Sequence, residues 1–209
     1  MKQAFTLSEV LITLGIVGIV AALTIPGLLA NYRKKVLASR LKKSYSVIQN
    51  TINTVNTENG LPFECYTLPG ADYHYTECDQ FFENFVKQLH VVNICKNSDK
   101  SCRPKYKSKA EVIAEGGSCP NNACSLPINE HTAYNLSDGS MIFVYDKLSN
   151  NKLFFGVDVN GTEGPNQWGY DLFYLNLFRQ NTTTAVIPIT AVCELIEKGG
   201  QSFEDAILN

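Results

Sequence analysis

The amino-acid sequence predicts an α+β fold in which one long N-terminal helix packs on an antiparallel sheet. Two observations predict it. Residues 5–58 carry a continuous helical pattern of about 80 Å, apolar on every side at first and on one side later. Beyond residue 130, short β-rich runs are separated by turns that contain glycine. One long helix followed by consecutive strands is typical of this fold class.

The first half of the predicted helix is long and apolar enough to cross a membrane. No charged side chain occurs from Val10 to Ala30, a run of about 21 residues, and a bilayer core requires about 20. A helix that is apolar on all faces must be buried in lipid or in other protein. We therefore expect residues 5–30 to form a transmembrane or assembly-core helix.

The charges beside this segment leave several interpretations open. A secretory signal peptide would be cleaved near Ala22 and a plain anchor would keep Met1, but the acid Glu9 is unusual at the flank of a signal peptide. The positive-inside rule, applied to the basic residues 33–35, places the rest of the chain in the cytoplasm. The seven cysteines favour an oxidising compartment instead, and we give them more weight.

A further interpretation comes from the residues around Glu9. The stretch Ala4-Phe5-Thr6-Leu7-Ser8-Glu9-Val10-Leu11-Ile12 resembles the processing site of type IV prepilins and type II secretion pseudopilins. The resemblance implies that residues 1–4 are a leader, that prepilin peptidase cuts between Ala4 and Phe5, and that the new amine of Phe5 is methylated. It also implies that Glu9 neutralises the amine of a neighbouring subunit during assembly. A carboxylate is costly near hydrocarbon unless it is paired, which supports that role.

Pro26 interrupts the apolar helix, and Gly15 and Gly18 lie within it. Proline removes one backbone hydrogen bond and kinks a helix, and glycine lowers helical stability. By resemblance to the family, a proline at this position bounds a segment that unwinds when subunits pack into a filament. A simple transmembrane kink is the alternative for Pro26.

Residues 31–60 form the amphipathic half of the predicted helix. Apolar residues recur at steps of three and four and predict a stripe that packs under a sheet: Leu37, Leu41, Tyr45, Ile48, Ile52 and Val55. Asn59-Gly60 and Pro62 end the helix. Between positions 33 and 43 there are six basic residues and no acid. Lipid headgroups, acidic neighbouring heads and DNA are the partners considered, and DNA is the weakest because no nucleic-acid motif accompanies them.

All seven cysteines lie beyond residue 60, which predicts an exported head braced by disulfides. Close spacing suggests the pairs Cys95–Cys102, Cys119–Cys124 and Cys65–Cys78, with Cys193 left over. Spacing does not determine connectivity, so other pairings stay open. A zinc site is the alternative, but these separations are wider than the two-residue spacing of zinc knuckles.

The head is predicted to contain a Cys-rich loop insertion, residues 61–130, and an antiparallel sheet with a C-terminal tail, residues 131–209. Apolar spacing predicts a helix at Asp79–His90. Beta-rich runs predict four strands, of which a turn at 137–140 joins the first two: Thr132–Leu136, Met141–Tyr145, Leu153–Val159 and Leu172–Phe178. The tail is expected to hold a strand at Val186–Ile189 and a helix at Ala191–Lys198.

One loop of the head carries oxygen side chains in an alternating pattern. Asp158 and Asn160 open the segment Asp158-Val159-Asn160-Gly161, and Asp171 follows. This pattern resembles the opening of a calcium loop, but Gly169 stands where the bidentate glutamate of such a loop belongs. Some type II secretion pseudopilins bind calcium in a C-terminal loop, so the resemblance admits calcium as a cofactor. An Asx- and Gly-rich turn with self-capping side chains is the favoured alternative.

The sequence carries no enzyme signature. His74, His90 and His131 are isolated, and no nucleophile elbow, phosphate loop or dinucleotide fingerprint occurs.

The prepilin resemblance implies a pilin-like fold and a structural subunit of a type IV pilus or type II secretion pseudopilus. It implies prepilin peptidase, other pilin subunits and inner-membrane assembly machinery as partners. The chain would be a single-pass protein of the bacterial inner membrane with its head outside the cytoplasm, and then part of a periplasmic or surface filament. The alternative is a membrane-anchored extracytoplasmic binding module that forms no filament.

Overall fold

The computed structural model describes residues 6–58, 76–96, 99, 101–119, 128–145, 153–180, 183–188 and 194–208. For residues 76–80, 144–145, 153–154, 176–180 and 183–188 it describes the backbone alone. The chain divides into two compact units, Met1–Val36 (the stem unit) and Leu37–Asn209 (the head unit). Helix α1 (Leu7–Glu58) is continuous and contributes residues to both. A long apolar N-terminal helix and an antiparallel sheet confirm the predicted α+β class.

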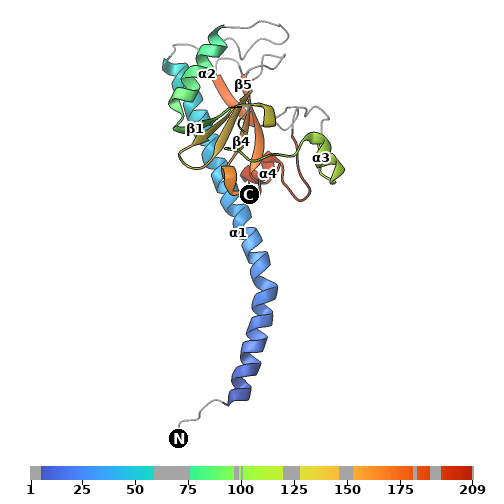
Figure 1. Ribbon diagram of the computed structural model, residues 1–209. Helices are drawn as coiled ribbons and strands as arrows, with labels where there is room; N and C mark the ends of the chain where they lie inside the picture. The colour runs from blue at the N-terminus through green and yellow to red at the C-terminus, as the bar shows by residue number, and fades with distance from the viewer. Residues whose placement is uncertain are drawn as a thin grey trace. The chain divides into compact units, whose positions relative to one another are not determined.

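The sheet of the head unit has six strands in sequence order, and every neighbouring pair is antiparallel (Figure 1). The strands are β1 (Val91–Cys95), β2 (Ala133–Leu136), β3 (Met141–Tyr145), β4 (Leu153–Asp158), β5 (Leu172–Gln180) and β6 (Thr183–Pro188). The four strands predicted between residues 132 and 178 are confirmed as β2 to β5. Strand β6 begins at Thr183, three residues before the strand expected there.

Short helices accompany the sheet. They are α2 (Thr76–Gln88), α3 (Lys109–Ala114) and α4 (Phe203–Leu208), with 3-10 turns η2 (Ile128–Glu130) and η3 (Gly161–Glu163). Helix α2 confirms the helix expected at Asp79–His90. The capping box of α3, in which Ser108 and Glu111 each hold the other's backbone N–H, fixes where that helix begins.

The first core cluster lies between α1 and one face of the sheet. The predicted stripe of α1 is confirmed, because Leu41, Ile48, Ile52 and Val55 are fully buried there. They pack with side chains from α2 and the sheet, among them Phe81, Phe85, Phe155, Val157 and Leu175. Phe85 of α2 contacts Phe155 of β4 with ring centroids 5.1 Å apart.

The second core cluster covers the opposite face of the sheet. Ile142 belongs to the first cluster, whereas its neighbours Met141 and Phe143 belong to the second. This alternation is the period of two expected for a strand covered on both sides. The second cluster is completed by Tyr106 and Trp168, each about 1% exposed.

The turn between β2 and β3 forms where the sequence predicts it. Leu136 N donates to Ser140 O at 2.8 Å, and Asp138 Oδ1 accepts from Ser140 N at 3.1 Å. Gly139 has φ 87°, a left-handed conformation that side-chain-bearing residues rarely adopt. The hairpin prediction is confirmed.

Two sequence-based expectations need correction. Strand β1 lies within residues 61–130, so the range predicted as an irregular insertion supplies an edge strand of the sheet. The helix predicted at Ala191–Lys198 is wrong over its described residues, because Ile196 forms an isolated β-bridge with Ser118. That bridge holds the backbone in an extended conformation. The helix of this region is α4, further along the chain.

Candidate functional site

The N-terminus of α1 is closed by a capping box that contains Glu9. Glu9 Oε2 accepts from Thr6 N at 2.9 Å and from Thr6 Oγ1 at 2.7 Å. Thr6 Oγ1 in turn accepts from Glu9 N at 3.3 Å. Glu9 Oε1 accepts no hydrogen bond from any described residue. Glu9 therefore has a local structural role, and among the described residues one of its carboxylate oxygens has no partner.

The apolar half of α1 is uncovered within the stem unit. Its large apolar side chains from Leu7 to Leu29 are between 43% and 80% exposed. In the described part of the chain, α1 is the one helix that is long and apolar enough to cross a membrane. So much exposed apolar surface requires lipid or other protein chains around it.

The remaining predicted assembly residues lie on this uncovered segment. A methyl group placed on Gly15 or Gly18 would meet nothing within 4 Å, so these glycines present smooth, open positions to a neighbour. Pro26 lies inside α1, and the helix continues through it. Because proline has no N–H, the carbonyl of Ala22 loses its usual partner there. Ala4 and Phe5 lie outside the described residues.

Basic side chains on α1 divide into two groups. In the head unit, Arg40 pairs with Glu163 at 2.9 Å and Lys43 pairs with Asp138 at 2.8 Å. These two ion pairs connect α1 to the η3 turn and to the β2–β3 turn. Exposed residues 33–35 and Lys42 have no ion pair among the described residues.

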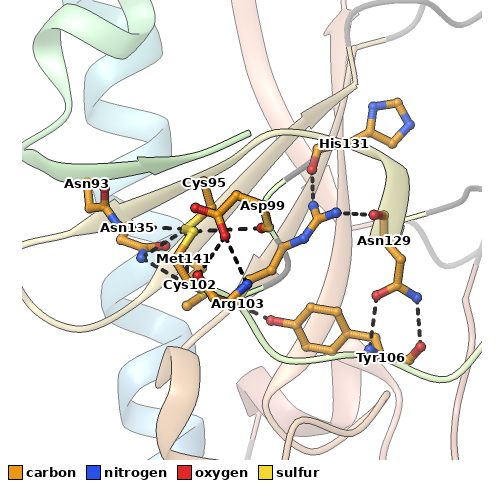
Figure 2. Close-up of a disulfide and its surroundings, with 11 residues drawn as sticks. Asn93, Cys95, Asp99, Cys102, Arg103, Tyr106, Asn129, His131, Asn135 and Met141 are labelled. Carbon is orange, nitrogen blue, oxygen red and sulfur yellow. Dashed lines mark hydrogen bonds between the residues drawn. A yellow bond between two sulfur atoms is a disulfide. The ribbon is translucent and has the colours of Figure 1, made fainter. Parts of the chain in front are cut away.

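A disulfide closes the loop that follows β1 (Figure 2). Cys95 and Cys102 are bonded, with their Cα atoms 5.8 Å apart, which confirms this predicted pair. Cys95 lies fully buried at the end of β1, and Asn135 of β2 donates to Cys102 O at 3.4 Å. The bond holds the returning chain beside the edge of the sheet.

The other predicted disulfides involve cysteines that the structure does not describe in full, so they stay predictions. Cys119 is a free, half-buried thiol, and Cys124, its predicted partner, lies outside the described residues. The thiol packs instead against the second core cluster, next to the Ser118–Ile196 bridge. Cys65, Cys124 and Cys193 lie outside the described residues, and of Cys78 only the backbone is described.

The segment after the disulfide is anchored by buried polar contacts (Figure 2). Arg103 is 6% exposed, and its guanidinium donates to the carbonyl oxygens of Asn129 and His131. Tyr106 N donates to Asn129 Oδ1 at 3.1 Å, and Asn129 Nδ2 donates to Tyr106 O at 2.8 Å. These contacts place the Tyr106 ring in the second core cluster, where it packs edge-on against Phe143.

Asp158 is the centre of a buried cluster of hydrogen bonds. Its Oδ2 accepts from Tyr106 Oη at 2.7 Å, and its Oδ1 accepts from Asn160 N and Gly161 N at 3.1 and 2.7 Å. The carboxylate is 0% exposed. Burial, with the nearby Asp171 carboxylate, raises the pKa of Asp158 to about 7. Burial and the Asp158 charge also raise the pKa of Tyr106, so its hydroxyl stays a proton donor.

Asp171 closes the other end of the same loop. It accepts from Asn166 N and Gln167 N, each at 2.7 Å, and it is 0% exposed. Burial raises the pKa of Asp171 as well. The structure therefore brings all three predicted loop residues together: Asp158, Asn160 and Asp171.

The oxygens of this loop are largely occupied by the loop's own donors. With the Asn166 amide oriented to satisfy its neighbours, its nitrogen donates to Gly161 O and to Asp158 Oδ2. Asn160 Oδ1 is a buried oxygen of this loop that accepts no hydrogen bond. No group of three or more His, Cys, Asp or Glu side chains that could hold a metal ion occurs in the described part of the chain. The geometry favours the Asx-rich turn over a calcium loop.

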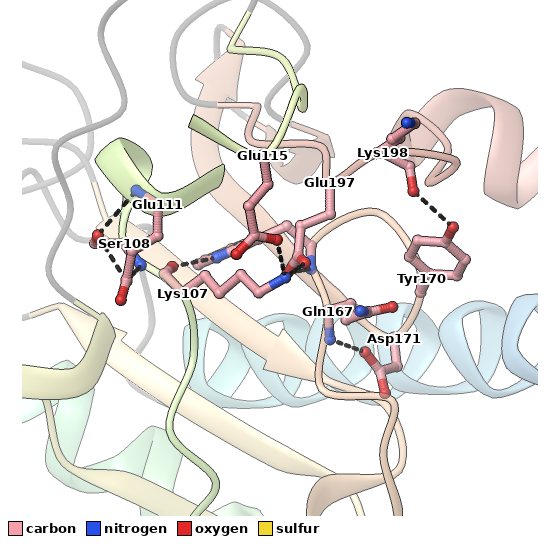
Figure 3. A network of polar contacts seen from close by, with 10 residues as sticks. Lys107, Ser108, Glu111, Glu115, Gln167, Tyr170, Asp171, Glu197 and Lys198 are labelled. Carbon is pink, nitrogen blue, oxygen red and sulfur yellow. Dashed lines mark hydrogen bonds and ion pairs between the residues drawn. The ribbon is translucent and has the colours of Figure 1, made fainter. Parts of the chain in front are cut away.

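The ion pairs of Lys107 with Glu115 and Glu197, which we call the latch, connect the C-terminal segment to the second core cluster (Figure 3). Lys107 Nζ lies 2.6 Å from Glu115 Oε2 and 2.7 Å from Glu197 Oε2, and Glu197 is nearly buried. The hydrogen bonds that Lys107 donates to Glu115 and Glu197 raise the pKa of Lys107. Glu197 Oε1 also accepts from Trp168 N, and Trp168 Nε1 donates to the carbonyl of Lys107. Three distant segments meet at this ion pair.

No protein-family model, no curated protein and no solved structure matches this chain.

Sequence reasoning missed the long-range partners of two buried carboxylates, Asp158 and Glu197. Tyr106 is 52 positions from Asp158, and Lys107 is 90 positions from Glu197. No local motif connects residues at such distances. The available signal was weak: Tyr106 and Lys107 stand together in a polar segment that has few other large apolar residues.

Proposed function

We propose that this chain is a structural subunit of a type IV pilin-like filament, either a type IV pilus or a type II secretion pseudopilus. Prepilin peptidase cleaves it between Ala4 and Phe5, and the subunit assembles through the apolar half of α1. The head unit then lies on the outside of the filament. The chain performs no catalysis in this proposal.

The observation that carries the proposal is the contrast between the two halves of α1. One continuous helix exposes its apolar side chains up to Leu29 and buries its stripe from Leu41 to Val55 under an antiparallel sheet. The buried half accounts for the stability of the head unit. The uncovered half has no function within one subunit, and lipid followed by other copies of the same helix would cover it.

Glu9 supports the same proposal. A charged group next to hydrocarbon is costly and normally has a partner. Thr6 engages Oε2 of Glu9 and leaves Oε1 open. The amine of a neighbouring subunit's Phe5 would fill that position, and the attraction between opposite charges is strong where water is excluded. This pairing would fix the register of adjacent subunits.

The disulfide supports an extracytoplasmic head. The Cys95–Cys102 bond is stable in an oxidising compartment and rare in the cytoplasm. A single span that exports the head fits both the membrane helix and this bond.

The N-terminus of the mature protein tests the proposal. Intact mass and N-terminal peptides would be measured on protein from its native membrane, with an Ala4→Leu variant as the cleavage-blocked control. We expect a chain that starts at methylated Phe5, and a chain that starts at Met1 in the variant. A wild-type chain that starts at Met1 in the presence of the peptidase would overturn the proposal in favour of the anchored binding module.

A further inference from the structure

Three consecutive basic residues follow the membrane-length part of α1. Arg33, Lys34 and Lys35 are exposed, and none has an ion pair among the described residues. We call them the basic collar. Of the next basic residues on the helix, Arg40 and Lys43 are engaged by Glu163 and Asp138. Lys42 is exposed and has no ion pair among the described residues, but it stands alone between these two. The collar therefore carries three positive charges that the described chain leaves unneutralised.

The length of α1 places the collar at the level of lipid headgroups. From Glu9 to Arg33 the helix rises about 36 Å, at about 1.5 Å per residue. The hydrocarbon core of a bilayer is about 30 Å thick, so with Glu9 at one boundary Arg33 lies just beyond the other. Tyr32, immediately before the collar, is 64% exposed. Tyrosine is enriched at this interface because its ring is apolar and its hydroxyl is polar.

We propose that the basic collar binds the phosphates of anionic phospholipids in the leaflet at the C-terminal end of the membrane span. Tyr32 lies between the acyl chains and the headgroups in this arrangement. The bound lipids fix the depth of the helix before assembly. They also neutralise the collar, whose charges stand on the side of the span where the positive-inside rule disfavours them.

The distribution of the charges favours lipid over an acidic protein surface as the partner. Successive residues of a helix point about 100° apart, so the three collar side chains spread over about 200° of its circumference. A ring of lipids meets all of these directions at once, whereas one face of another protein meets only some of them. The head is acidic, with nineteen acids against eleven basic residues from position 44 onward, and an acidic head alone would be repelled by anionic lipid. The collar supplies the opposing attraction.

The proposal rests on membrane insertion of α1 and does not depend on filament assembly. It is tested with the full chain reconstituted in phosphatidylcholine bilayers. Spin-labelled phosphatidylglycerol or phosphatidylcholine would be added, and electron spin resonance would measure the fraction of each lipid that the protein immobilises. The ratio of the two association constants is the readout.

The collar variant carries Arg33→Gln, Lys34→Gln and Lys35→Gln. Its control carries Lys87→Gln, Lys96→Gln and Lys105→Gln, three exposed basic residues of the head unit. Each basic residue near an anionic surface is worth about fivefold in affinity. We expect the wild type and the control to select phosphatidylglycerol, and the collar variant to lose at least about fivefold of that selectivity. About 0.5 M salt is expected to weaken the wild-type preference.

Two results would overturn the proposal. One is a collar variant as selective as the wild type. The other is a wild type without selectivity for phosphatidylglycerol; a collar variant that then fails to enter filaments would assign the collar to the acidic head of a neighbouring subunit. Because lipid selectivity is measured on reconstituted protein, failure of the filament proposal would leave this test intact.

Discussion

At the scale of single residues, the same local motif occurs in two surroundings. Glu9 and Glu111 each complete a capping box, with Thr6 and Ser108 respectively. The box of α3 is exposed to water in the head unit, where its charge has little consequence. The box of α1 stands at the start of the apolar segment, where an ionised carboxylate needs a cationic partner. Position along the chain, and not the motif, gives Glu9 its proposed role.

Replacing Glu9 by glutamine separates the charge of this residue from its capping function. Glutamine still accepts the Thr6 hydrogen bonds, so we expect α1 to form and the protein to insert into the membrane at the wild-type level. Without the charge, pairing with a neighbouring amine is lost, and the fraction of the protein in sheared filaments should fall at least about tenfold. Glu111→Gln is the matched control and should assemble normally. Wild-type incorporation of Glu9→Gln would refute the pairing mechanism.

At the scale of elements, α1 is one continuous helix whose two halves need different surroundings. Ile52 is 0% exposed in the first core cluster, whereas Ile19 is 64% exposed in the stem unit. Isoleucine at position 52 therefore stabilises the head, whereas isoleucine at position 19 faces whatever surrounds the helix. Local backbone preference does not distinguish them; the presence of the sheet does.

The pair Ile52→Ala and Ile19→Ala tests this division. Truncating the buried isoleucine leaves a cavity, and we expect the free energy of unfolding of the head to fall by about 2–5 kcal/mol. The exposed isoleucine should change it by less than about 0.5 kcal/mol. Urea unfolding in detergent, followed by the fluorescence of Trp168, measures both, because Trp168 is the only tryptophan and is buried in the head. Equal losses would contradict the division.

Among the elements, the sequence predicted those in which apolar residues recur at a regular spacing. The stripe of α1 and the strands β2 to β5 follow from apolar spacing and from the turn at Gly139. Strand β1 was missed because Val92 and Ile94 are exposed at the edge of the sheet, so its residues do not alternate between buried and exposed positions. The C-terminal segment was misassigned because its extended form comes from the bridge to Ser118, a long-range contact that no local pattern encodes.

At the scale of the whole molecule, contacts between distant segments hold the head together. The loop carboxylates Asp158 and Asp171 were identified from sequence, but the donor Tyr106 was not, because 52 positions separate it from Asp158. The latch from Lys107 to Glu197 was missed for the same reason. Local patterns indicate which residues are unusual, whereas the fold determines what they contact.

The buried carboxylates make the stability of the head depend on pH. Burial and the Asp171 charge raise the pKa of Asp158 to about 7, from the value of 3.8 expected in the unfolded chain. The folded chain therefore binds more protons than the unfolded chain between about pH 4 and pH 7, and the free energy of unfolding falls as the pH rises through this range. The pKa values of Asp99, Glu111 and Asp138 are lowered, so their contributions are constant above about pH 5.

We therefore expect the head to unfold at a lower urea concentration at pH 8 than at pH 5. Between pH 5 and the folded pKa of about 7 the slope is about 1.4 kcal/mol per pH unit, so Asp158 contributes about 3 kcal/mol to the difference. Asp158→Asn should flatten the profile between these pH values, because its oxygen still accepts from Gly161 N and its amide donates to the Tyr106 oxygen without any charge. Tyr106→Phe removes a donor that lowers the pKa of Asp158 and should steepen the profile. The midpoint is measured by Trp168 fluorescence. A wild-type midpoint that stays constant or rises from pH 5 to pH 8 would show that the folded head does not raise the pKa of Asp158.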